Sequence, residues 1–194
     1  CPTHAGVSLG EDGGSHQSVE DVALMRAIPG MVVLSPADAV ETEKMVFAAA
    51  EYKGPVYVRL GRLNIPVLFD ENYKFEIGKA GTLTEGKDVA ILATGLMVSE
   101  ALEAAKLLEE KGVKARVVNV STIKPLDTET VLKAAKECKF IVTSEEHSVI
   151  GGLGSAVSEY LSEVHPTKVV KHGIQDVFGQ SADGETMLTN YGLR

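Results

Sequence analysis

Short apolar runs alternate with amphipathic stretches along most of the chain. The runs are rich in Val, Ile and Leu without strict polar alternation, which is typical of strands covered on both faces. Their alternation with helices of about 10–15 residues indicates βαβ units and a mostly parallel sheet. The predicted strands are 31–35, 56–60, 89–94, 115–122, 140–145 and 168–174, and the predicted helices are 19–28, 39–53, 98–112, 128–138, 151–164 and 184–193.

Polar and turn-forming residues set the predicted helix ends. Ser18 stands where it can cap the first helix, with Asp21 three residues later as its capping-box partner. Pro29 and Gly30 should end that helix, and Gly54 with Pro55 should end the second. Asp127 or Thr128 should cap the helix that follows it.

The stretch from Pro66 to about residue 80 carries Pro, Gly and charged residues and no apolar periodicity. We therefore place a domain boundary near 70–76 and expect an α/β fold in two parts. Residues 1–72 should form a partial open α/β sheet, because they offer only two strands and two helices. Residues 73–194 should form a complete three-layer α/β domain with a mostly parallel sheet. The chain is thus expected to be a fragment that starts inside a domain.

The acidic charge of the chain narrows the classes of partner. A formal net charge of −8 disfavours nucleic acid and anionic membranes, because both repel an acidic surface. The two cysteines, Cys1 and Cys138, are too few for a disulfide framework and fit no zinc motif. With no signal-peptide pattern and no apolar run near the roughly 20 residues of a membrane span, we expect a cytoplasmic location.

The opening segment "CPTHAGVSLGEDGGSHQ" gathers candidate site residues before any predicted strand. It contains His4, Asp12 and His16 among several glycines, and Arg62 follows the second predicted strand. A guanidinium suits a phosphate dianion, a carboxylate accepts a sugar hydroxyl, and an imidazole exchanges protons near neutral pH. The ordinary alternatives are a solvated histidine, a turn-capping aspartate and a surface cation.

The motifs "GEDGGSHQSVEDVALMRAIPGMVVLSPAD" (10–38) and "GPVYVRLGRLNIP" (54–66) resemble the transketolase family. In the second part, "TIKPLD" (122–127), "SEEHSVIGGLGSAVSE" (144–159) and "FGQSADGETMLTNYGL" (178–193) are similar to its C-terminal domain. The resemblance covers nearly the whole chain. It implies transfer of a two-carbon ketol unit between sugar phosphates on thiamine diphosphate, a cofactor that itself stabilises the carbanion.

Four positions carry over from the family's substrate site. His4 and Arg62 match the positions that hold the sugar phosphate. Asp12 matches the position that reads a substrate hydroxyl. His16 matches the catalytic position that contacts the hydroxyl next to the reacting carbonyl.

The same resemblance implies which parts are missing. The glutamate that activates the cofactor's pyrimidine ring should lie upstream of Cys1, and the diphosphate and Mg²⁺ belong to a separate N-terminal portion or subunit. This chain alone is therefore expected to bind neither cofactor nor metal and to be inactive. Its expected partners are sugar phosphates, the N-terminal portion, and a second copy through the C-terminal domain.

Several alternatives stay open. A deoxyxylulose-phosphate synthase or a 2-oxo-acid dehydrogenase β subunit shares the helix–strand layout. A non-catalytic module could bind a small anion where "GGLGS" (151–155) opens a helix, although a simple tight turn explains that segment as well. An N-terminal nucleophile at Cys1 conflicts with the βαβ alternation.

Other polar residues receive structural predictions. Arg59 is expected to be structural or at an interface, and His147 to lie at the surface or an interface. Cys138 is expected to be buried and inert.

Overall fold

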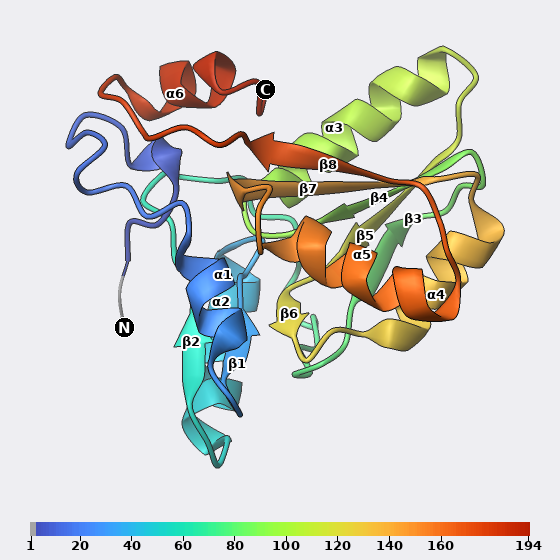
Figure 1. Ribbon diagram of the computed structural model, residues 1–194, viewed down its shortest axis with the longest axis horizontal. Coiled ribbons are helices and arrows are strands. Elements are labelled where there is room, and N and C mark those ends of the chain that lie inside the picture. Colours follow the sequence, from blue (N-terminus) through green and yellow to red (C-terminus); the bar gives the residue numbers. More distant parts are fainter. Residues whose placement is uncertain (1–2) are drawn as a thin grey trace.

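The computed structural model describes residues 3–194 and contains two β-sheets (Figure 1). The strands are β1 (Val32–Leu34), β2 (Val56–Val58), β3 (Gly81–Thr84), β4 (Val89–Ala93), β5 (Ala115–Asn119), β6 (Thr122–Lys124), β7 (Ile141–Ser148) and β8 (Val169–Ile174). The smaller sheet has the order β2-β1-β6, and the larger has the order β3-β5-β4-β7-β8. In the larger sheet only the pairing of β3 with β5 is antiparallel. The predicted mostly parallel α/β fold is confirmed.

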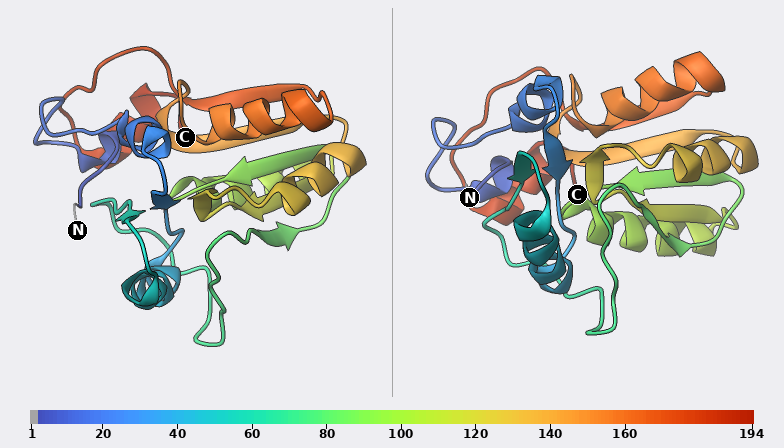
Figure 2. Two further views of the ribbon diagram at one scale, coloured as in Figure 1. Left: turned by 60° about the horizontal axis from the view of Figure 1, so that its bottom comes forward. Right: turned by 90° about the horizontal axis from the view of Figure 1, so that it is seen from below.

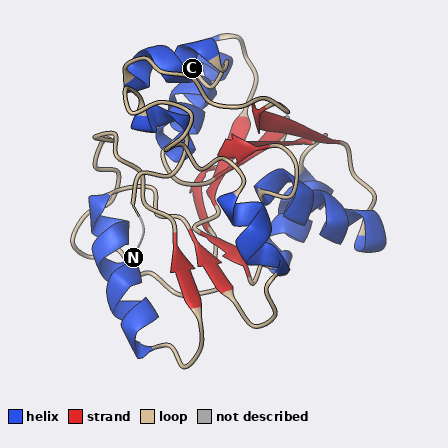
Figure 3. Ribbon diagram, turned by 60° about the vertical axis from the view of Figure 1, so that its left-hand side comes forward, coloured by secondary structure: helices blue, strands red, loops and turns tan. Residues whose placement is uncertain are grey.

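Helices cover both sheets. They are α1 (Asp21–Ala27), α2 (Ala39–Glu51), α3 (Met97–Glu110), α4 (Thr128–Glu137), α5 (Leu153–Val164) and α6 (Gly184–Asn190), preceded by the short 3-10 helix η1 (Val7–Leu9). The larger sheet lies between α3 on one face and α4 with α5 on the other (Figure 2). The smaller sheet lies beside α1 and α2, as Figure 3 shows from another side.

Strand β4 shows why the larger sheet needs helices on both faces. Successive side chains of a strand point to opposite faces. Ile91 and Ala93 pack with the buried residues of α3 and α6, whereas Ala90 and Leu92 pack with those of α4 and α5. All five residues of β4 are buried, so the strand reads as one continuous apolar run.

The strand predicted at 115–122 is two strands in different sheets. β5 ends at Asn119, and β6 pairs antiparallel with β1 of the smaller sheet. The backbone N–H of Ser35 donates to the carbonyl of Ser121 at 2.8 Å, which fixes the crossing point. Residues 115–123 are buried without a break, and both strands mix apolar with polar residues, so the sequence pattern carries no sign of the change of sheet. The edge strand β3 was also missed by the sequence prediction.

The predicted capping box at the first helix is wrong. Helix α1 begins at Asp21, and its N-cap residue Glu20 makes no side-chain capping bond. The carboxylate of Asp21 instead accepts hydrogen bonds from Arg59 and Tyr57. The predicted cap at Asp127 is confirmed, since its side chain accepts the N–H of Thr130.

Buried carboxylates order the connection between the two sheets. Asp38 Oδ2 accepts the N–H groups of Leu68 and Phe69 at 2.7 and 2.8 Å. Glu41 accepts the hydroxyl of Tyr73 at 2.6 Å and the side-chain amide of Asn119 at 2.9 Å. The connection is thereby attached to the start of α2. Among residues 3–194, no helix combines the length and apolar character that crossing a membrane requires.

Candidate functional site

An exposed ion pair joins two of the predicted site residues. Arg62 Nη1 lies 2.8 Å from Asp12 Oδ2, and the two side chains are 45% and 50% exposed. The same nitrogen donates to the carbonyl of Leu9 at 3.2 Å. The structure therefore brings together a carboxylate and a guanidinium that are 50 residues apart in sequence.

Consecutive turns shape the loop that carries Asp12 and His16. The N–H of Gly13 donates to the carbonyl of Gly10, and the N–H of His16 donates to the carbonyl of Gly13, both at 3.0 Å. Gly10 and Gly13 have φ values of 83° and 80°, in the left-handed region that glycine adopts without a steric penalty. The glycines thus allow a compact loop that presents polar side chains to solvent.

The two histidines of the predicted site are exposed, and among the described residues each ring hydrogen bonds only with the residue directly before it. His4 Nδ1 hydrogen bonds with Thr3 Oγ1, and His16 Nδ1 hydrogen bonds with Ser15 Oγ at 3.0 Å. His4 has φ of 73°, an uncommon value for a residue with a side chain. Within residues 3–194, neither ring is hydrogen bonded to Asp12 or Arg62. Convergence of all four side chains on one ligand stays a prediction.

Two hollows flank the segment that carries Arg62. One of about 270 Å³ is lined by Arg62 together with Ser8, Leu9, Glu11, Leu63, Asn64, Asp183 and Gly184. The other, of about 410 Å³, lies where β1 and β2 end and includes Ser35, Arg59 and Glu146 among its lining residues. Leu63 and Asn64 line both hollows. A ligand held by Arg62 would therefore lie beside a second cavity, whose lining combines apolar side chains with Arg59 and Glu146.

A buried ion pair lies next to the larger of these two hollows. Arg59 Nε lies 2.8 Å from Asp21 Oδ2, and the side chains are 9% and 7% exposed. Arg59 also donates to the carbonyl of Glu146 at 2.9 Å. Burial acts to raise the pKa of Asp21, but Arg59 and the hydrogen bonds from Arg59 and Tyr57 outweigh it and hold that pKa below its ordinary value. The predicted structural role of Arg59 is confirmed.

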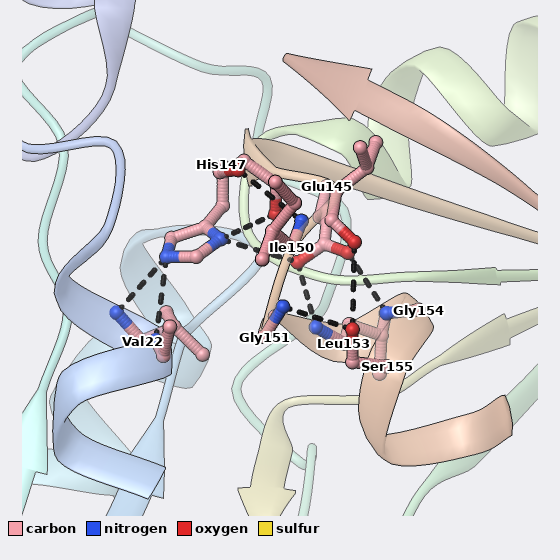
Figure 4. A network of polar contacts seen from close by, with 12 residues as sticks. Val22, Glu145, His147, Ile150, Gly151, Leu153, Gly154 and Ser155 are labelled. Carbon is pink, nitrogen blue, oxygen red and sulfur yellow. Dashed lines mark hydrogen bonds and ion pairs between the residues drawn. The ribbon is translucent and has the colours of Figure 1, made fainter. Parts of the chain in front are cut away.

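Three consecutive residues of β7, Glu145, Glu146 and His147, anchor three different elements. Glu145 accepts the N–H groups of Leu153 and Gly154 at 2.7 and 2.8 Å, at the start of α5 (Figure 4). Glu146 accepts the N–H of Ser8 in η1 at 2.6 Å. Charged residues directly after the apolar start of this strand were the sequence signal for such buried anchors, and the sequence prediction missed it.

The predicted surface position of His147 is wrong, since the side chain is buried. Its Nε2 accepts the N–H of Val22 at 3.1 Å, and its Nδ1–H donates to the carbonyl of Ser148 at 2.7 Å (Figure 4). These partners require the neutral ring with its proton on Nδ1. Burial and the charge of Arg59 lower the pKa of His147, which favours that neutral form. His147 thus supplies from β7 the cap that α1 lacks.

The segment Gly151–Ser155 is a tight turn, and the anion-site alternative is overturned. The N–H groups that would receive an anion at the start of α5 already bind the carboxylate of Glu145. A side chain at Gly152 would overlap that carboxylate. Burial raises the pKa of Glu145 to about 7, although the two N–H groups act in the opposite direction.

Cys138 is buried, as predicted, and its thiol donates to the carbonyl of Gly86 at 3.4 Å. Cys1, considered above as a nucleophile, lies outside the described residues.

Comparisons with known proteins match both parts of the chain. The family model described as "Transketolase, pyrimidine binding domain" matches residues 1–67, and "Transketolase, C-terminal domain" matches residues 78–194. A "Putative transketolase C-terminal section" of Methanocaldococcus jannaschii is 48% identical over 98% of this chain and 60% of its own length. A 1-deoxy-D-xylulose-5-phosphate synthase of Synechococcus is 39% identical over all of this chain and 30% of its own.

A solved structure described as "Split gene transketolase, inactive beta4 tetramer" has the same fold. It is 52% identical with a TM-score of 0.91, over 98% of this chain and 61% of that chain. The present chain thus spans about 60% of the length of that structure and of the archaeal relative.

Proposed function

The chain belongs to the transketolase family, and from this premise we propose that it is the C-terminal part of an enzyme that transfers ketol units between sugar phosphates on thiamine diphosphate. The observation that carries the proposal is the exposed pair of Asp12 and Arg62 beside a polar hollow. A carboxylate and a guanidinium in contact can bind a hydroxyl and a phosphate group of a single ligand.

The weakness of the exposed pair suits this role. An ion pair this accessible contributes only about 0.2–1 kcal/mol. A phosphate dianion can therefore replace Asp12 on Arg62 at little cost, since it offers stronger and bidentate hydrogen bonds. The released carboxylate is then free to accept a sugar hydroxyl. We assign His4 to the phosphate as well, and His16 to the hydroxyl beside the reacting carbonyl, where it can hold or move a proton.

The residues present do not fit the metal-bound diphosphate of the cofactor. Within residues 3–194, no group of three His, Cys, Asp or Glu side chains is arranged to hold a metal ion. We therefore assign thiamine diphosphate and Mg²⁺ to an N-terminal portion or partner subunit, and we propose that the chain alone has no ketol transfer activity. The description of a similar protein as a split gene transketolase supports this division. We further propose pairing with a second copy through the C-terminal domain.

Ketol transfer by this chain together with the N-terminal portion of its enzyme tests the proposal. Replacing Arg62 with Leu should raise KM for a phosphorylated acceptor about 10–100-fold, the loss expected for hydrogen bonds to a charged group. KM for an unphosphorylated acceptor should stay unchanged. Arg194→Leu is the matched control, because Arg194 is also 45% exposed and paired with a carboxylate, that of Glu100. Equal losses with both acceptors would contradict the assignment of Arg62.

A deoxyxylulose-phosphate synthase is the second candidate, because one such enzyme matches the whole chain at 39% identity. The two functions differ in the donor substrate. A transketolase takes its ketol unit from a ketose phosphate, whereas a deoxyxylulose-phosphate synthase requires a 2-oxo acid that loses carbon dioxide. Release of carbon dioxide from pyruvate by the complemented enzyme, without transfer from a ketose phosphate, would select the second candidate.

A further inference from the structure

The loop that carries Asp12 and His16 is packed against a segment near the other end of the chain, residues 178–184, which we call the C-terminal strap. Gln17, directly after His16, makes the main connection. Its side chain is 8% exposed, and its Nε2 donates to the carbonyl of Gln180 at 2.8 Å across 163 positions of sequence. The same nitrogen lies 3.2 Å from the carbonyl of Val7. One buried amide thus joins the start of the loop to the strap.

Glycines allow the two segments to approach at backbone distance. A Cβ on Gly14 would lie 2.5 Å from the carbonyl oxygen of Gly179. A Cβ on Gly179 would overlap the side chain of Gln17. A Cβ on Gly10 would lie 3.0 Å from the carbonyl oxygen of Ala182. The contact at Gly14 is with backbone and is shorter than real Cβ atoms show, and Gly10 also has a φ of 83°, so glycine at these positions favours the close approach of the loop and the strap.

Two further hydrogen bonds connect the loop through the strap to α6. Ser181 Oγ donates to the carbonyl of Glu11 at 2.8 Å. The hydroxyl of Tyr191, at the end of α6, donates to the carbonyl of Phe178 at 2.7 Å. The strap is therefore held at one end by α6 and contacts the loop next to Asp12, through Glu11, and next to His16, through Gln17.

We propose that the C-terminal strap sets the position of Asp12 and His16 for substrate, and that Gln17 is the positioning residue that transmits it. This inference rests on the proposed function for its effect on catalysis. The physical reason is that, among the described residues, the side chain of Asp12 bonds to the exposed Arg62 and that of His16 to the exposed Ser15. The loop that carries them is held by the flanking residues Glu11 and Gln17, and both of these are bonded to the strap.

Hydrogen exchange of the chain by itself tests the structural part. The amides of Gly13 and His16 are hydrogen bonded within the loop and report on its order. Gln17→Ala should speed their exchange about tenfold or more, the change expected when a buried hydrogen-bonding group is removed. Ser181→Ala changes an exposed position and should speed the exchange of these amides less. This variant provides the test if Gln17→Ala does not fold. Gln175→Ala is the control, because its side-chain amide bonds to the carbonyl of Gly173 and, among the described residues, not to the loop.

Kinetics of the complemented enzyme test the functional part. Gln17→Ala should lower kcat/KM for sugar phosphates about tenfold and weaken discrimination between epimers at the hydroxyl read by Asp12, with thiamine diphosphate affinity unchanged. Gln17→Glu keeps the shape without the donor and should behave like Gln17→Ala.

Unchanged exchange at Gly13 and His16 in both Gln17→Ala and Ser181→Ala would overturn the inference. A loosened loop with wild-type kinetics and discrimination would overturn its catalytic part. Absence of ketol transfer by the wild-type complemented enzyme would instead refute the proposed function, and exchange would still decide whether the strap orders the loop.

Discussion

Replacing Asp21 with Ala should destabilise this protein by about 3–5 kcal/mol, because it leaves a buried guanidinium without its counter-charge. The side chains of Arg59 and Asp21 are 9% and 7% exposed, and Arg59 Nε lies 2.8 Å from Asp21 Oδ2. Arg59 keeps its bonds to the carbonyls of Ser18 and Glu146, which places the expected loss toward the lower end. The pair joins α1 to β2, so its loss acts on the support of the candidate site.

Urea unfolding followed by circular dichroism measures this loss. Lys106→Ala is the matched control, since the Lys106–Glu103 pair is 69% and 66% exposed and should contribute less than about 1 kcal/mol. The double variant Asp21→Ala with Arg59→Met should recover much of the stability, because no unpaired charge remains.

The pH dependence gives a second check on the same pair. The pKa of Asp21 in the folded protein is below its ordinary value of 3.8. The contribution of ionised Asp21 to the free energy of unfolding is therefore present above pH 3.8 and is lost as the pH falls through the folded-state pKa. An Asp21→Ala variant no less stable than Lys106→Ala would refute the assignment of a desolvated ion pair.

Two further predictions concern the buried carboxylates of β7. The pKa of Glu145 is raised from 4.5 to about 7, so its contribution is complete below pH 4.5 and falls by about 3 kcal/mol as the pH rises through 7. The urea midpoint of the wild-type protein should fall between pH 4.5 and 7.5, and that of Glu145→Gln should not fall in this way. The same fall of the midpoint with pH in both proteins would contradict the prediction. Gly6→Ala should unfold at lower temperature than Gly30→Ala: φ is positive at both, but only at Gly6 would a Cβ overlap a carboxylate, that of Glu146. Equal melting temperatures would refute that packing argument.

The order and type of most elements could be read from the sequence. Continuous apolar runs such as β4 report burial on both faces, and helical spacing with the cap at Asp127 reports an amphipathic helix. These are local signals, because each depends only on residues that are close to one another in sequence. The loop with Asp12 and His16 was likewise visible as a concentration of polar side chains and glycines.

The partners of polar residues were decided only by the tertiary structure. His147 is buried because α1, from another part of the chain, places its N–H groups on the ring. Asp21 fits a capping pattern in sequence, yet Arg59 lies within its reach and forms the stronger charged interaction. The sequence also hides the change of sheet between β5 and β6, since residues 115–123 are buried without a break and the new strand partner, β1, comes from another part of the chain.

The candidate site divides in the same way. The sequence by itself determined which residue types are available, namely Asp12, His16 and Arg62 near glycines. Only the folded chain decided that Arg62 lies against Asp12 and that Gln17 reaches the strap 163 positions away. Hydrophobic periodicity records whether a position is buried, whereas a hydrogen bond or ion pair depends on distances of about 3 Å between atoms that the chain brings together only when it folds.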